Sequence, residues 1–255
     1  MFKSIRILIL LLILLGVAMA SWRAQSAAVS WKYTLAINVY PINGDGSAVA
    51  EAYARNLTKE EFAPIEQFML DEAARYGRSG DASVEVHLRP MLAALPPAPP
   101  INGNLFEVIV WRLNLRWWSY RHADAKGPGP QISLFVLYFD PAKHAQLDHS
   151  TALQKGLIGR VNVFASREMS GQNNVIIAHE FLHTLGASDK YDLATNLPIF
   201  PLGYAEPQRL PLLPQTLAEI MGGRVPVTPT MAHIPSSLNE VVIGKITALE
   251  INWLH

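Results

Sequence analysis

The sequence predicts one mixed α/β (α+β) domain, in which strands cluster early and helices follow. The chain has 255 residues, of which 50% are hydrophobic and 16% are charged, so it is long enough to bury one large core. Short stretches of alternating apolar and polar residues predict strands in the first two thirds of the chain. Helical periodicity and capping signals dominate the last third. This order is typical of a sheet covered by helices.

The first predicted elements are a strand, a helix and a second strand. Residues 31–40 alternate apolar with polar side chains, and residues 82–88 do the same, so both segments are expected to be strands. The helix between them is expected over residues 58–77. Its ends carry a capping box and a C-terminal stop, at Thr58, Glu61 and Gly77.

A proline-rich connector at residues 96–103 separates these elements from a helix expected over residues 104–120. Residues 131–139 are an almost continuous apolar run, which predicts a central strand buried on both faces. Residues 159–166 alternate and predict a strand with one exposed face. This last strand is expected to pair with an extended ligand backbone, as sheet edges do.

The segment 104–120 has two interpretations. Arginines and aromatics on it are compatible with a helix that lies on a membrane surface. The favoured interpretation is a helix that packs its aromatic side chains on the sheet, because the apolar residues Val108, Trp111, Leu115 and Trp118 line one side.

The last third of the chain is expected to begin with a helix near Asn173. A proline-rich stretch over residues 197–214 predicts no regular structure. Residues 236–253 are expected to close the chain as one helix, with Ser237 and Glu240 as its capping box.

The first twenty residues are expected to lie outside the domain, which then spans residues 21–255. Lys3 and Arg6 precede an uncharged apolar run, and Ala18 and Ala20 are small residues suited to a cleavage site. Residues 1–20 are therefore a signal peptide or, if uncleaved, an N-terminal anchor with residues 7–20 in the membrane. Both interpretations predict an exported protein, either periplasmic or secreted.

Composition excludes several classes of function. The formal net charge is zero and no basic block occurs, so nucleic acid is not an expected partner. The sequence has no cysteine, which excludes disulfides, thiolate metal ligands and a cysteine nucleophile. Any metal must therefore be held by His, Asp or Glu side chains.

The segment HEFLHTLGASDKYD, residues 179–192, contains the strongest chemical signal. Residues four apart lie on one face of a helix, so His179 and His183 can share one metal ion. Glu180 follows the first histidine, where its carboxylate can act as a general base on water at the metal. Two histidines and a base on one helix are typical of zinc peptidases.

Zinc needs a third protein ligand, and Asp189 is the favoured one. Gly186 can end the helix in a left-handed conformation, and Asp189 comes three residues later. The other possible ligands are Asp192, Glu206 and Glu219. Tyr191 is a possible hydrogen-bond donor to an oxyanion. The remaining histidines have no ligand-like spacing and are expected to have no role in the site: His87, His122, His144, His149, His233 and His255.

The segment HEFLHTLGASD resembles the signature of the metzincin zinc peptidases, H-E-x-x-H-x-x-G-x-x-H, with Asp in the place of the third histidine. This substitution is similar to that of the snapalysin-type enzymes. The resemblance implies a twisted mixed sheet, an active-site helix, a methionine-containing turn beneath the metal and a C-terminal helix. Met221 in AEIMGG has the position expected for that turn.

The predicted function is that of an exported zinc endopeptidase, a monomer with one Zn²⁺ held by His179, His183 and Asp189 and with Glu180 as the catalytic base. Its expected partner is a peptide or an unfolded protein, and a membrane is contacted only through an uncleaved N-terminal segment. Two rival hypotheses are a catalytically silent binding module of the cell envelope and a membrane-anchored interaction protein. A two-histidine, one-carboxylate iron site is less favoured, since iron oxygenases have no use for Glu180.

Overall fold

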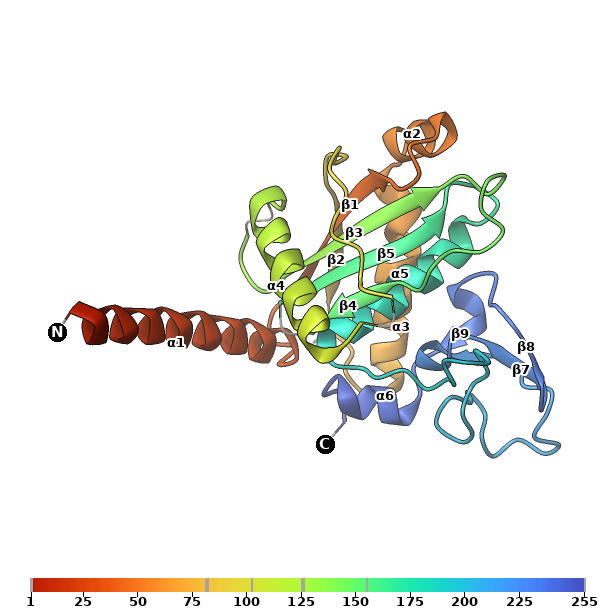
Figure 1. Ribbon diagram of the computed structural model, residues 1–255. Coiled ribbons are helices and arrows are strands. Elements are labelled where there is room, and N and C mark those ends of the chain that lie inside the picture. The colour runs from red at the N-terminus through yellow and green to blue at the C-terminus, as the bar shows by residue number, and fades with distance from the viewer. Residues whose placement is uncertain (1, 81–82, 102, 125–126, 155, 255) are drawn as a thin grey trace.

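The computed structural model describes residues 2–80, 83–101, 103–124, 127–154 and 156–254. Within these ranges the chain is a mixed α/β fold built on a five-stranded sheet with the order β2-β1-β3-β5-β4 (Figure 1). β1, β2, β3 and β5 run parallel, and β4 pairs antiparallel with β5. The strands are β1 (Leu35–Asn43), β2 (Val84–Leu88), β3 (Gln131–Phe139), β4 (Thr151–Leu153) and β5 (Ile158–Phe164).

Helices cover both faces of the sheet, which explains its continuous apolar strands. The larger core lies on the face covered by α2 (Ala48–Arg55), α3 (Ala63–Arg75) and α5 (Ser170–Leu185). The smaller core lies on the opposite face, under α4 (Leu105–His122). β3 has the predicted bounds and is buried on both faces over its seven central residues.

The N-terminal elements differ from the predictions in position. α1 (Phe2–Ala28) is one long helix, and β1 begins at Leu35 rather than at residue 31. Trp31 does not lie in the strand, because its indole N–H donates to the Ile251 carbonyl (2.7 Å) in the opposite part of the chain. α2 was not predicted; Ser47 caps it by accepting the Ala50 N–H.

The predicted helix over residues 58–77 is a 3₁₀ turn, η1 (Lys59–Phe62), followed by α3. The backbone N–H of Thr58 donates to the Glu61 carboxylate (3.4 Å), as the capping box predicts. Proline lies in the first turn of α3, where its missing N–H costs no helical hydrogen bond.

The predicted closing helix over residues 236–253 is wrong. The segment forms a 3₁₀ turn η3 (Leu238–Glu240), a short strand β9 (Val241–Val242) and α6 (Lys245–Glu250). Ser237 makes no cap, because the Glu240 carboxylate instead accepts the N–H and hydroxyl of Ser236. β9 pairs with β6 (Ala218–Glu219), and this long-range pairing overrides the local helical pattern.

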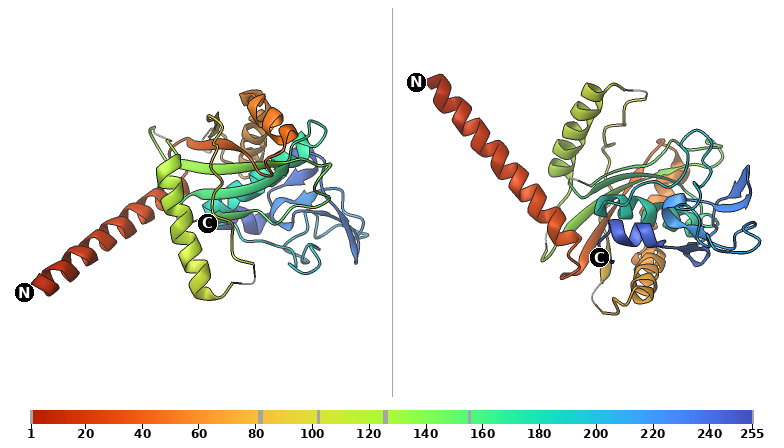
Figure 2. Two further views of the ribbon diagram at one scale, coloured as in Figure 1. Left: turned by 45° about the horizontal axis from the view of Figure 1, so that its top comes forward. Right: turned by 90° about the horizontal axis from the view of Figure 1, so that it is seen from below.

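Between α5 and α6 the chain is mostly irregular, in agreement with its proline content. Besides η3 and β9, its short elements are β6, the 3₁₀ turn η2 (Ile220–Gly222), β7 (Val225–Thr228) and β8 (Met231–His233). This region lies along the end of α5 in the views of Figures 1 and 2. Gly222, Arg224 and Ile234 of this region line a cleft together with His179 and Glu180 of α5.

The prediction that residues 159–166 lie at a sheet edge is wrong for the first part of β5, where β4 pairs with Ile158–Arg160. β5 lies between β3 and β4, so both of its edges are paired along part of its length. Among the described strands, β4 is the one at this edge of the sheet.

Candidate metal centre

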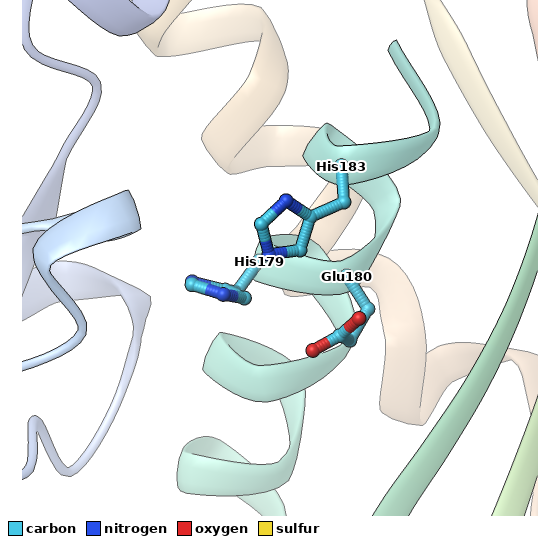
Figure 3. Close-up of side chains that lie close together, drawn as sticks. All are labelled: His179, Glu180 and His183. Carbon is cyan, nitrogen blue, oxygen red and sulfur yellow. The ribbon is translucent and has the colours of Figure 1, made fainter. Parts of the chain in front are cut away.

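α5 positions the two histidines of the motif. Its buried face includes Ala178, Phe181 and Leu185, which fix the helix on the sheet. His179 and His183 lie one turn apart with ring centroids separated by 4.6 Å, and Figure 3 shows both imidazoles projecting from the same part of α5. The helix ends at Gly186 as predicted, with φ +110°.

Each imidazole is held by a backbone carbonyl. Nδ1 of His179 donates to the Ile220 oxygen (2.9 Å), and Nδ1 of His183 donates to the Ala187 oxygen (2.7 Å). In the neutral ring these bonds place the proton on Nδ1, so that Nε2 of each imidazole carries the lone pair a metal ion needs. Metal-binding histidines have this arrangement, because the outer hydrogen bond fixes the tautomer and the ring orientation.

Asp189 meets both histidines. Its Oδ1 lies 3.1 Å from Nε2 of His179 and 3.1 Å from Nε2 of His183. Ligand atoms about 2.1 Å from a tetrahedral Zn²⁺ are separated by about 3.4 Å, so both of these distances are compatible with shared coordination of one zinc ion. The structure therefore brings together the three residues predicted from the motif.

The chain on both sides of Asp189 is fixed by distant residues. The Ser188 hydroxyl and N–H donate to the Glu250 carboxylate, and the Lys190 ammonium also donates to it (2.7 Å). The Lys190 N–H donates to the Met221 carbonyl (2.8 Å). Lys190 is buried, so this ion pair with Glu250 is shielded from water. The motif gave no indication of these supports.

Glu180 lies beside the ligand atoms with one oxygen free. Its side chain is 4% exposed, and Oε2 has no hydrogen-bond partner among the described residues. A buried carboxylate oxygen is normally satisfied, so it indicates a place for a water molecule or a substrate group. Glu180 is also within 4.8 Å of the histidine nitrogens. Asp189 is the better third ligand, because one oxygen atom is equally close to both imidazoles.

The charges of the site favour a cation. Burial lowers the pKa of His179, but the hydrogen bond to Asp189 and the charge of Glu180 outweigh it and raise that pKa to about 9. Burial raises the pKa of Asp189, but its hydrogen bonds to the two histidines hold the pKa well below its usual range. Burial raises the pKa of Glu180. A divalent cation would compete with protons for the same Nε2 and Oδ1 atoms.

Met221 lies in η2, next to the residue that binds His179. It is fully buried, and the turn is held by the Glu219 carboxylate, which accepts the Gly222 N–H (2.9 Å). The carbonyl that orients His179 belongs to Ile220. The turn therefore supports the site through its backbone, and Met221 fills the core beneath it.

The alternative ligands are engaged elsewhere. Asp192 accepts N–H groups of Ala194 and Thr195 in a turn, and Glu206 accepts the N–H and hydroxyl of Thr216. Glu219 is occupied by the Gly222, Gly244 and Thr247 donors.

Tyr191 lines the cleft in front of α5, with its ring centroid 6.3 Å from that of His179. Burial and the charges of Asp189 and Glu180 raise its pKa, so it keeps its proton and can donate a hydrogen bond. Arg224 and His149 are among the residues of this cleft that the motif did not indicate. Arg224 directly follows two glycines after Met221; His149 comes from the loop before β4 and has no local signal.

No protein-family model matches the chain, and no curated protein matches its sequence.

Proposed function

We propose that the protein is an exported zinc endopeptidase with a metzincin-like fold, in which His179, His183 and Asp189 hold one Zn²⁺. The observation that carries this proposal is the position of Asp189 Oδ1, 3.1 Å from both Nε2 atoms, while both Nδ1 atoms are engaged by carbonyls. The sheet with one antiparallel edge strand, the glycine at the end of α5 and the buried Met221 turn support the metzincin-like assignment. The apolar N-terminal helix supports export.

Zinc bound there would lower the pKa of a water molecule and polarise a peptide carbonyl. Glu180 has an unpartnered Oε2 beside the ligand atoms, where it can accept a proton from that water and pass it to the leaving nitrogen. Tyr191 keeps its phenolic proton and can donate a hydrogen bond to the carbonyl oxygen as negative charge develops on it. The cleft also contains Arg224, which can bind a negatively charged group of the substrate.

The strand β4 is the sheet edge next to this cleft. Residues 148–150, directly before β4, line the cleft together with His179 and Glu180. An extended peptide can add to such an edge through main-chain hydrogen bonds, which favours unfolded or extended substrates. Because the strand edge binds the main chain, the enzyme would select substrates by their extended backbone rather than by particular side chains.

The test uses the full chain purified in detergent, with a reduced unfolded protein as substrate. The proposal predicts one zinc per chain by elemental analysis and cleavage of internal peptide bonds. Glu180→Gln should keep the zinc and lose about 10²–10⁴-fold in rate, which is the usual contribution of a general base. Glu206→Gln, which changes a carboxylate outside the site, should keep both the zinc and the rate.

A chain that binds zinc but cleaves no substrate would favour the catalytically silent binding module. A chain that binds no zinc, or a Glu180→Gln variant that cleaves at the original rate, would contradict the proposed function.

A further inference from the structure

α4 presents apolar side chains on two opposite faces. Its inner face packs on the sheet through Trp111 and Leu115, and Trp118 contacts the ring of Phe135 edge-on with centroids 4.8 Å apart. This confirms the predicted packing of the helix on the sheet. The second interpretation, in which the helix contacts a membrane surface, depends on the outer face of α4.

The outer face carries a continuous apolar stripe. Phe106 is 73% exposed, Trp117 62% and Tyr120 79%. The exposed large apolar residues recur every three or four positions, so they share one side of the helix. They are Leu105, Phe106, Ile109, Val110, Leu113, Trp117 and Tyr120. An exposed apolar stripe of this length marks an interaction surface.

Basic side chains flank this outer stripe. Arg112 and Arg116 lie along one side of it and Arg121 along the other. Within the part of the chain that the structure describes, none of these guanidinium groups pairs with a carboxylate. Stacked aromatics such as Trp117 and Tyr120, together with arginines, are typical of helices at the boundary between lipid headgroups and acyl chains.

α1 ends beside this surface. A 24-residue stretch, Ile5–Ala28, is long and apolar enough to cross a membrane. The helix is unbroken across Ala20, and the Arg116 guanidinium of α4 donates to the Ser21 hydroxyl (3.4 Å). At the end of α1, Ala28 is fully buried and the following Val29 carbonyl accepts from the Asn252 side chain, so this end is fixed on the domain. Figures 1 and 2 show α4 next to this end and running across the direction of α1.

We propose that α1 stays attached as a membrane anchor and that the outer stripe of α4 lies in the surface of the same bilayer, with its arginines on anionic lipid headgroups. If α1 spans the bilayer, the membrane surface lies close to the end of α1 that joins the domain. α4 lies at this end, and its apolar, arginine-flanked face points away from the sheet. The chain thus has two contacts with the bilayer, one spanning it and one on its surface.

This placement has a consequence for substrates, which rests on the proposed function. A second cleft runs between α4 and β4 and reaches the candidate metal site. Its walls include Arg112 and Arg116 on one side, Ala152 and Gln154 on the other, and His183 at its end. With α4 on the bilayer, polypeptide segments that lie close to the membrane surface have the most direct access to this cleft.

The test uses the absence of cysteine, because one introduced cysteine gives one labelled site. The full-length variants Trp117→Cys and Val49→Cys are labelled with an environment-sensitive fluorophore and reconstituted in vesicles of phosphatidylcholine and phosphatidylglycerol. Val49 lies on α2 and is 48% exposed, so it serves as the matched control. Circular dichroism verifies that both variants are folded.

The proposal predicts a blue shift at position 117 and loss of its fluorescence when the lipids carry nitroxide quenchers near the headgroup. Position 49 should show neither. Adding Arg112→Gln and Arg121→Gln should reduce the quenching at 117 in vesicles with phosphatidylglycerol. The intact mass of the membrane-extracted chain should include α1. These readouts need neither zinc nor cleavage, so they can fail independently of the proposed function.

Several results would overturn the proposal. One is a label at 117 that is as exposed to water as the label at 49. Another is a label shielded from water but not quenched by lipid, together with cross-linking between copies, which would make α4 a dimer interface. A mature chain that begins after Ala20 would also contradict it.

Discussion

α5 and the irregular segment that follows it contribute to the same candidate metal site by different means. The histidines of α5 are placed by helical spacing on a helix buried against the sheet. Asp189 is placed by contacts with residues far along the chain, since its neighbours bind Glu250 and Met221. The helix therefore provides a rigid pair of ligands, and tertiary structure provides the third. Disturbing the two regions should have distinguishable effects.

The largest effect is expected from removing a ligand from either region. His183→Ala and Asp189→Ala should each weaken zinc binding by more than the ~10–100-fold that outer partners usually contribute. Competition with a chromogenic chelator measures this loss. Asp192→Ala should bind zinc normally, because Asp192 only holds a turn. If Asp189→Ala also binds zinc normally, the third ligand is a different residue and the comparison does not hold.

A smaller effect is expected from the support of the irregular segment. Glu250→Gln removes the charge that pairs with buried Lys190 and weakens the hold on Ser188. Zinc affinity should fall by about 10–100-fold, as for other outer-shell changes at metal sites. The same titration on Glu240→Gln, an exposed carboxylate bound to Ser236, should show no change. Equal affinities for both variants would show that Asp189 does not depend on Glu250.

The junction between the two regions is Gly186. Its φ of +110° is unfavourable for an alanine, and an added Cβ would meet the Gln154 side chain. Gly186→Ala should lower the free energy of unfolding by about 1–3 kcal/mol, measured by chemical denaturation. Gly46→Ala is the matched control, since Gly46 also has positive φ but open space around it, and it should cost only about 1 kcal/mol. A smaller loss at Gly186 than at Gly46 would contradict the role of the junction.

The smallest effect is expected at Met221. Met221→Leu keeps nearly the same volume in the core, so it should cost less than about 1.5 kcal/mol in the free energy of unfolding. Zinc affinity should not change, because His179 is held by the Ile220 carbonyl rather than by the methionine side chain. A large loss of zinc with intact stability would assign the methionine side chain a direct role in the site.

The contrast between local helical spacing and contacts with distant residues also explains which parts of the fold and of the site could be predicted from the sequence. β3 has its predicted bounds because nine consecutive residues suited to a buried strand leave no alternative. The positions of His179 and His183 follow from helix geometry alone. β4 was missed because its three residues are too few for an alternating pattern, although its partner β5 is close in the sequence. The final helix was predicted wrongly, because β9 is defined by its pairing with β6, which is distant in the sequence. The support of Asp189 by Glu250 has no local signal for the same reason.

Some signals were present in the sequence but weak. Ser47 precedes an alanine-rich stretch with Glu51 in its first turn, a pattern that fits the cap of α2. The outer stripe of α4 has a helical repeat that a second, inner apolar face obscures. His149 reaches the cleft only because its loop folds against the end of β5, where the Asn162 side chain donates to the Asp148 carbonyl (3.0 Å).

The most direct test of the metal centre is X-ray absorption at the zinc edge on the full chain loaded with one equivalent of Zn²⁺. Two imidazole nitrogens and at least one oxygen are expected about 2.0–2.1 Å from the metal. Asp189→Ala is expected to lose the carboxylate oxygen and to keep both imidazoles. A spectrum with fewer than two imidazoles, or one that Asp189→Ala leaves unchanged, would contradict a site built jointly by α5 and the segment after it.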